Sequence, residues 1–299
     1  MTTASFIPQG PFSLASSIRF LEGFTPASYD HAADGVLRLA FPADDHQGVI
    51  GCALRQKEAV GEPGLVSAEF TGHADIEVAR NQIARILSLD IDGTGFPAVG
   101  ERDSVVASLQ AEFPGLRPVC FHSPYEAAAC AVIGHRIRMA QAAAIKARLA
   151  RDHGRRVDVA GQRLHAFPAP AVLLSLTRIP GLTDVKVERL HAIAEAALDG
   201  RLDASALRSS DAGRALKDLQ SLPGIGPFSA ELILIRGAGH PDVFPTAEPR
   251  VHRAVAREYG LGEAPAFSRL AGIAEAWRPY RSWVALLLRS RMAAATCGG

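Results

Sequence analysis

Two glycines lie two residues apart in Leu222-Pro-Gly-Ile-Gly226, between two segments with helical patterns, Asp211–Leu219 and Pro227–Gly237. Because glycine has no side chain, Gly224 and Gly226 allow backbone N–H groups to approach a phosphate closely. The positive end of the following helix dipole lies at the same place. This hairpin predicts contact with the backbone of one DNA strand, without reading of its sequence. The alternative is an ordinary tight turn.

A second segment, Asp242–Val255, follows the hairpin and places Glu248 between Pro245 and Pro249 at the start of a predicted helix. With the hairpin, it resembles the HhH-GPD superfamily of DNA glycosylases, and more closely the AlkA type of 3-methyladenine DNA glycosylase. The resemblance covers most of residues 113–291 and implies an α+β fold. A strand-rich N-terminal domain (residues 1–115) is then followed by an all-α helix-hairpin-helix domain (residues 116–299).

Glu248 stands where this family has its catalytic aspartate, which is a departure from the pattern. Cleavage of an N-glycosidic bond develops positive charge on the sugar, and a nearby carboxylate stabilises that charge and orients or deprotonates water. Glutamate supplies the same anion on a side chain one methylene longer, and a displacement of roughly 1 Å can cost on the order of a hundredfold in rate. The alternative is that Glu248 is only an acid favoured by the dipole of the following helix.

The residue just after the hairpin separates two kinds of family member. Bifunctional members carry a lysine there that forms a Schiff base with the sugar, whereas this chain has Phe228. The resemblance therefore implies a monofunctional enzyme, with water as nucleophile and an abasic site as product. The four cysteines show no CxxC spacing and match neither a zinc site nor an iron–sulfur cluster. No metal or other cofactor is expected in the chemistry, although the hairpin carbonyls could bind a structural cation beside a phosphate.

Base recognition is expected to require extrusion of the nucleotide into a pocket. By position, Phe228, Leu232 and Arg289 line that pocket, although Phe228 could instead be ordinary core. Leu232 and Arg289 stand where the AlkA type has a tyrosine and a tryptophan. The loss of two aromatic faces weakens the case for cationic alkylated purines, and a guanidinium favours a neutral or electron-rich base.

Further DNA contacts are expected from two loops and helices. His135 and Arg136 fall on the loop that fills the gap left by the extruded base, and arginine can insert there although the family uses an apolar residue. Arg250 and Arg253 follow Glu248 and are candidate phosphate contacts. The alternative for all four is a solvated protein surface.

The 299 residues are 48% hydrophobic and 21% charged, which excludes a disordered chain. The net charge of +1 conceals an asymmetry, because residues 1–116 carry −8 and residues 117–299 carry +9. A basic second part favours a polyanionic partner, here duplex DNA with a damaged base. The first residues lack a basic and apolar leader, and no apolar run is long enough to span a membrane, so a cytoplasmic protein is expected.

The elements that position these residues follow from periodicity and turn signals. Four strands are predicted at Phe12–Phe20, Gly35–Ala40, Gly48–Arg55 and Val66–Phe70, and two helices at Ile76–Leu89 and Val105–Glu112. Ser123-Pro-Tyr-Glu126 is a helix-capping pattern that opens the second domain. Further helices are predicted at Pro168–Leu176, Thr183–Leu198, Asp203–Leu207, Asp211–Leu219, Pro227–Gly237, Pro249–Tyr259, Phe267–Ala276 and Tyr280–Arg291.

Together these patterns predict a monomeric, monofunctional DNA glycosylase that excises an alkylated purine from duplex DNA during base excision repair. The exchange of aspartate for Glu248 and the reduced aromatic pocket leave an alternative, a non-catalytic lesion-binding protein of the same fold. A bifunctional glycosylase for oxidised purines is a third possibility, which Phe228 disfavours.

Overall fold

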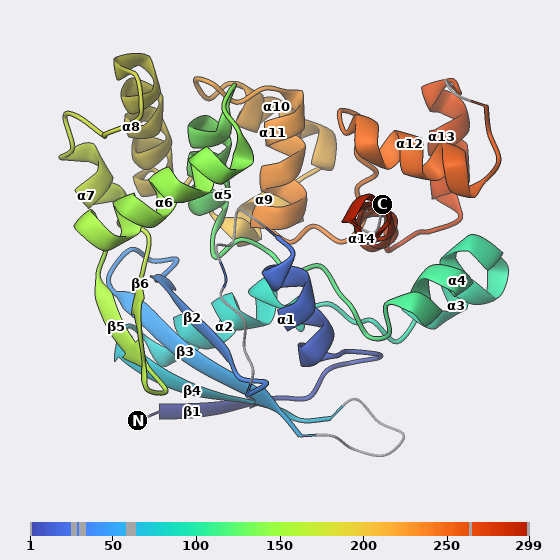
Figure 1. Ribbon diagram of the computed structural model, residues 1–299, viewed down its shortest axis with the longest axis horizontal. Coiled ribbons are helices and arrows are strands. Elements are labelled where there is room, and N and C mark those ends of the chain that lie inside the picture. Colours follow the sequence, from blue (N-terminus) through green and yellow to red (C-terminus); the bar gives the residue numbers. More distant parts are fainter. Residues whose placement is uncertain (1, 25–28, 30–33, 58–63, 263–264, 298–299) are drawn as a thin grey trace.

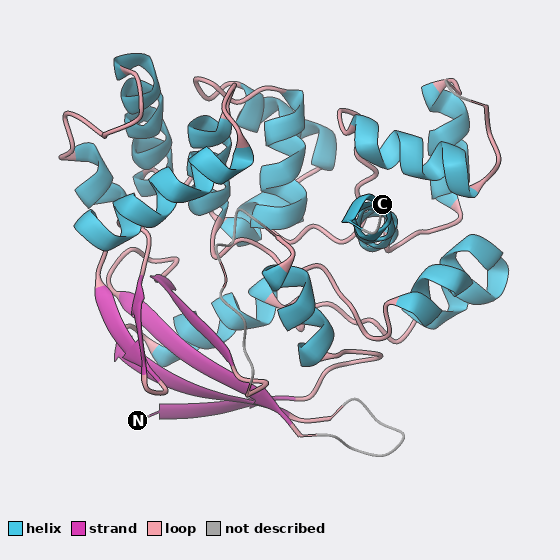
Figure 2. Ribbon diagram, viewed as in Figure 1, coloured by secondary structure: helices cyan, strands magenta, loops and turns pink. Residues whose placement is uncertain are grey.

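The computed structural model describes residues 2–24, 29, 34–57, 64–262 and 265–297. One antiparallel sheet lies at one end of the molecule, and helices occupy the rest (Figures 1 and 2). The strand order is β1-β4-β3-β2. In this register Cys52 of β3 faces Leu39 of β2 on one side and Phe70 of β4 on the other. The strands are β1 (Thr2–Phe6), β2 (Leu37–Pro42), β3 (Val49–Gln56) and β4 (Val66–His73).

The prediction of a strand at Phe12–Phe20 is wrong, because this segment forms the helix α1 (Leu14–Glu22). The Ser13 side chain caps the helix by accepting a hydrogen bond from the Ser16 amide at 3.1 Å. Leu14, Ile18 and Leu21 recur at helical spacing and are buried against one face of the sheet, beside α2 (Ile76–Ile86). The other three predicted strands are confirmed as β2, β3 and β4, while β1 was not predicted.

The α+β class is confirmed, but the second region is not helical throughout. Residues Arg156–Val159 and Gln162–His165 form a two-stranded hairpin, β5 and β6. Val157 and Val159 pack against Val36, Ala40, Val49 and Ala53. Since these sheet residues alternate with those that face α1 and α2, the hairpin covers the opposite face of the sheet.

The predicted helices of the second region are present with shifted ends. Pro227–Gly237 divides into a helix and a π-helical turn, and α3 was not predicted. Ser123 caps α5 by accepting from the Glu126 amide at 3.0 Å, as the sequence indicated. The bounds are α3 (Phe96–Arg102), α4 (Ser104–Glu112), α5 (Pro124–Gly134), α6 (Met139–His153), α7 (Pro170–Leu174), α8 (Asp184–Leu198), α9 (Ala204–Ser209), α10 (Ala212–Gln220), α11 (Pro227–Leu232), η2 (Ile233–Gly237), α12 (Pro249–Glu258), α13 (Phe267–Glu275) and α14 (Arg281–Cys297).

The helices share two cores. One surrounds the buried, alanine-rich helix α5 and includes α6, α8, α10 and η2. The other joins α3 and α4 to α12, α13 and α14 around Trp277 and Trp283. Asp103 strengthens that junction, because its carboxylate accepts hydrogen bonds from Tyr259 (2.6 Å) and Trp277 (3.1 Å). Helices that precede residue 115 thus pack on the C-terminal helices, and a domain boundary near residue 115 stays a prediction.

Three further observations concern the described part of the chain. Cys52, Cys120 and Cys130 are free thiols. No group of three or more His, Cys, Asp or Glu side chains there could hold a metal ion. None of the helices described is long and apolar enough to cross a membrane.

Candidate active site

The predicted hairpin connects α10 to α11. Gly224 has a φ of +86°, a left-handed conformation that favours glycine. The turn is closed by the Ile225 amide, which donates to the Leu222 carbonyl at 3.1 Å. Neither the Gly224 nor the Gly226 amide donates a hydrogen bond within the described residues. Both are therefore available to an external acceptor at the start of α11, as a phosphate site requires.

The loop of residues 238–248, which leads to Glu248, is anchored at its beginning by α14. The Ser282 hydroxyl accepts from the Val243 amide and donates to the Val243 carbonyl, both at 3.0 Å. The Asp242 carboxylate accepts from Arg281 Nε at 2.8 Å and pairs with Arg278 at 3.1 Å. Asp242 therefore holds the loop to the start of α14, which is a structural role.

The end of the same loop is held by Glu231 of α11, a residue that the sequence did not single out. Its buried carboxylate accepts from the Thr246 amide at 2.7 Å and the Ala247 amide at 2.9 Å, and also from the Thr246 hydroxyl. The helix that follows the hairpin thus positions the two residues before Glu248. The available signal was an acid between the apolar residues Ala230 and Ile233.

Glu248 is the N-terminal boundary residue of α12, but its side chain does not cap that helix. Its carboxylate instead pairs with Arg289 of α14, with Arg289 Nη1 3.0 Å from Glu248 Oε1. The Glu248 side chain is 18% exposed and the Arg289 side chain is 35% exposed, so the pair is accessible from solvent. The structure therefore brings together two of the predicted site residues, 41 positions apart in the sequence.

A second guanidinium, from Arg236 of η2, lies near this pair. Its central carbon is 4.9 Å from the ring centroids of both Phe20 and Phe24, and its Nε donates to the Val119 carbonyl at 2.9 Å. Burial lowers the pKa of Arg236 to about 10, and the positive charge of Arg289 also contributes. Phe20, Phe24 and Arg236 were not predicted as site residues; Phe20 lies on α1, which was interpreted as a strand.

Phe228 and Leu232 lie one turn apart on α11. Phe228 is 46% exposed, so its interpretation as ordinary core is wrong. Leu232 is half-buried and packs against the core around α5. Glu231, on the same helix, accepts a hydrogen bond from the loop that carries Glu248. A place for Phe228 and Leu232 in a base pocket stays a prediction.

The predicted gap-filling loop connects α5 to α6. His135 ends α5, and both His135 and Arg136 are exposed. Arg136 has a φ of +57°, a conformation that costs a non-glycine residue about 1 kcal/mol. Lys186 holds the base of the loop by donating to the Ile133 carbonyl at 2.7 Å.

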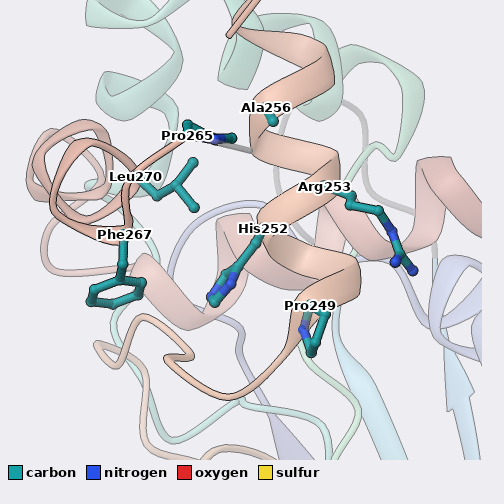
Figure 3. Close-up of a pocket in the computed structure, with 7 residues that line it drawn as sticks. All are labelled: Pro249, His252, Arg253, Ala256, Pro265, Phe267 and Leu270. Carbon is teal, nitrogen blue, oxygen red and sulfur yellow. The ribbon is translucent and has the colours of Figure 1, made fainter. Parts of the chain in front are cut away.

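Arg250 and Arg253 are exposed on the first turns of α12. Arg253 also borders a cavity of about 210 Å³ between α12 and α13 (Figure 3). Glu248 and Arg289 are not among the residues that line this cavity, so it lies beside the site and is not part of it. Its lining consists of Pro249, His252, Arg253, Ala256, Pro265, Phe267 and Leu270.

No protein-family model matches the chain. Among curated proteins, it is 31% identical over 214 residues to the probable bifunctional transcriptional activator/DNA repair enzyme AlkA of Mycobacterium tuberculosis, which covers 70% of this chain and 42% of that protein. This chain thus spans less than half of the length of that relative. It is 26% identical over 283 residues to DNA-3-methyladenine glycosylase 2 of Escherichia coli, and 93% of each chain is covered.

Solved structures show the same fold. The 3-methyladenine DNA-glycosylase from Archaeoglobus fulgidus superposes with a TM-score of 0.75 at 23% identity, covering 96% of this chain and 97% of that one. An 8-oxoguanine glycosylase/lyase from Clostridium acetobutylicum, in complex with double-stranded DNA, superposes with a TM-score of 0.67 at 14% identity. The superposition covers 100% of this chain and 98% of that one. The fold is that of the HhH-GPD glycosylases. Together with the curated relatives, this fold supports an AlkA-like DNA glycosylase.

Proposed function

We propose that this chain is a monofunctional DNA glycosylase that removes an alkylated base from duplex DNA and leaves an abasic site, the first step of base excision repair. The observation that carries the proposal is the placement of Glu248. Its carboxylate lies at the start of α12, on a loop held at one end by α14 and at the other by the helix of the DNA-binding hairpin. The curated relative from Escherichia coli is named DNA-3-methyladenine glycosylase 2, which supports the same activity.

In this mechanism the hairpin amides of Gly224 and Gly226 hold a phosphate of the damaged strand. The base turns out of the duplex, and Glu248 lies beside its sugar. As the bond between C1′ and the base nitrogen breaks, its electron pair leaves with the base, and the carboxylate stabilises the positive charge on the sugar. A water molecule, oriented or deprotonated by Glu248, then adds to C1′. Phe228 has no amine, so no Schiff base forms at its position.

The remaining contacts in the proposal come from exposed cations. Arg136 enters the gap left by the base, with His135 beside it, while Arg250 and Arg253 bind phosphates next to Glu248. The base pocket is formed by Phe228, Leu232 and Arg289. The enzyme acts as a monomer in the cytoplasm on duplex DNA that contains a damaged base.

The test is release of bases from methylated duplex DNA, identified by mass, for the parent and for Glu248→Gln. The parent should release methylated bases, and Glu248→Gln should lose at least a hundredfold in rate while binding DNA as before. Glu258→Gln, which changes an acid at the other end of α12, is the control. Borohydride should trap no covalent adduct. If the parent binds DNA yet releases no base of any kind, the non-catalytic alternative replaces this proposal.

A further inference from the structure

We infer that Arg289 determines the specificity of the site: it directs excision toward damaged bases that are neutral in DNA and accept hydrogen bonds, and away from purines that alkylation has made cationic. This inference rests on the proposed function, because it assumes that the damaged base lies beside Glu248. It assigns to one side chain the choice between two chemical classes of substrate.

The first observation is the hydrogen-bonding capacity of Arg289. A guanidinium has five N–H donors, and in the described part of the chain Arg289 uses one of them, toward Glu248. The side chain is 35% exposed and comes from α14, while its partner comes from the loop before α12. Four donors beside the proposed catalytic carboxylate are thus available to acceptor atoms of a bound base.

The second observation is the balance of charge. Arg236 is a half-buried cation that donates to the Val119 carbonyl and forms no ion pair with a described carboxylate. It stacks on Phe20 and Phe24 and lies close enough to Arg289 for their charges to interact. Glu248 balances one of the two guanidinium charges, so these three groups leave an excess of one positive charge.

These observations separate the two substrate classes. A purine methylated at a ring nitrogen such as N7 carries a positive charge while attached to the sugar, and like charges in a partly buried site repel one another. A neutral base instead gains negative charge as its glycosidic electron pair arrives. Arg289 can stabilise that charge by hydrogen bonding, without giving up a proton, because a guanidinium stays protonated.

The experiment compares single-turnover release of two alkylated purines from otherwise identical duplexes, neutral 1,N6-ethenoadenine and cationic 7-methylguanine. Spontaneous loss is subtracted. The parent should release ethenoadenine at least as fast as 7-methylguanine. Arg289→Met keeps a long apolar side chain and removes the donors and the charge. It should change the ratio of the two rates by at least tenfold in favour of 7-methylguanine. Arg257→Met removes an exposed cation from α12 and should leave the ratio unchanged within twofold.

Three other outcomes decide against the inference in different ways. Equal losses for both substrates in Arg289→Met would make Arg289 a residue that only positions Glu248, while the proposed function of the parent would stand. If Arg289→Met kept full activity and an unchanged ratio of the two release rates, Arg289 would not contact the damaged base. Release of neither base by the parent would contradict the proposed function and the inference with it. Arg289→Gln keeps hydrogen-bond donors but loses the charge. Its ratio of the two release rates should fall between those of the parent and Arg289→Met.

Discussion

The carboxylate of Glu231 on α11 accepts a hydrogen bond from the backbone amide of Thr246 at 2.7 Å, two residues before Glu248. The carboxylate is buried, and both of its oxygens accept hydrogen bonds from this loop. The helix that follows the hairpin of residues 222–226 therefore also fixes the backbone next to the candidate catalytic residue. In the proposed function, the Glu231 side chain would couple binding of a phosphate by the hairpin to placement of Glu248 near the sugar.

Glu231→Gln should lower the single-turnover rate of base release by at least tenfold, with a smaller effect on DNA binding. The reason is that an amide nitrogen would face a backbone N–H, which leaves one buried donor without an acceptor and costs about 1–3 kcal/mol. The measurement is base release under saturating enzyme, with affinity for the same duplex measured separately. Glu195→Gln, an exposed acid on α8, serves as the control. An equal loss of affinity and rate would contradict a positioning role.

Gly226→Ala should weaken binding to duplex DNA by at least tenfold without destabilising the free protein. An added Cβ at Gly226 would meet no heavy atom within 4 Å, and its φ of −90° is ordinary for alanine. The methyl group would instead occupy the space where a phosphate approaches the hairpin amides. Fluorescence anisotropy with thermal unfolding checks both parts. Gly272→Ala, on α13, has equal space and should bind normally. Normal binding by Gly226→Ala would remove the hairpin from the interface.

Arg136→Gly should reduce excision by at least tenfold and leave the unfolding free energy unchanged or slightly increased. Glycine adopts the φ of +57° observed at this position without strain, so the substitution removes the side chain but keeps the loop conformation. Fluorescence of 2-aminopurine placed at the target position would report the lost base extrusion. His135→Gly changes the neighbouring side chain and tests whether the effect belongs to Arg136. Full activity in Arg136→Gly would assign the gap-filling role to another residue.

Stability should fall below about pH 4.5 because of Glu126 on α5. Burial alone would raise the pKa of this carboxyl, but His122 (2.8 Å) and Lys146 (2.6 Å) hold it well below its usual value. A lowered pKa in the folded state adds stability above the unfolded value, and this stability is lost as the pH falls toward the folded value.

Urea unfolding at pH 7, 4 and 3 measures this dependence. Glu126→Gln should be less stable at pH 7 by about 3–5 kcal/mol, because it removes the buried carboxylate that pairs with Lys146 and is hydrogen-bonded to His122. It should also lose less stability than the parent between pH 7 and pH 3. Glu69→Gln, an exposed acid of β4, should behave as the parent does. Parallel pH curves for Glu126→Gln and the parent would contradict the assignment.

Local signals in the sequence predicted local structure well. The two glycines marked the hairpin, and Ser123 marked the start of α5, because turns and caps depend on a few adjacent residues. Phe12–Phe20 was mistaken for a strand because its apolar residues fit both periods over so short a segment. The β5–β6 hairpin was missed because Val157 and Val159 alternate within a run of charged residues.

The candidate site was predicted less completely than the fold. The positions of Glu248 and Arg289 came from resemblance to a family, but their ion pair joins residues 41 apart and depends on how α14 packs against the loop before α12. Glu231 and Arg236 gave no distinct signal, since a single charge in an apolar helix looks the same whether it meets solvent or a backbone partner. Tertiary packing decides such cases.

The β5–β6 hairpin has a consequence for the order of events during synthesis. The sheet is complete once β4 has left the ribosome, but one of its faces stays uncovered until residues 156–165 follow. Val36, Ala40, Val49 and Ala53 are therefore open to water or to a chaperone during that interval. The segment that covers this face is synthesised after α5 and α6. Folding of the N-terminal sheet can therefore finish only after part of the helical region has been synthesised.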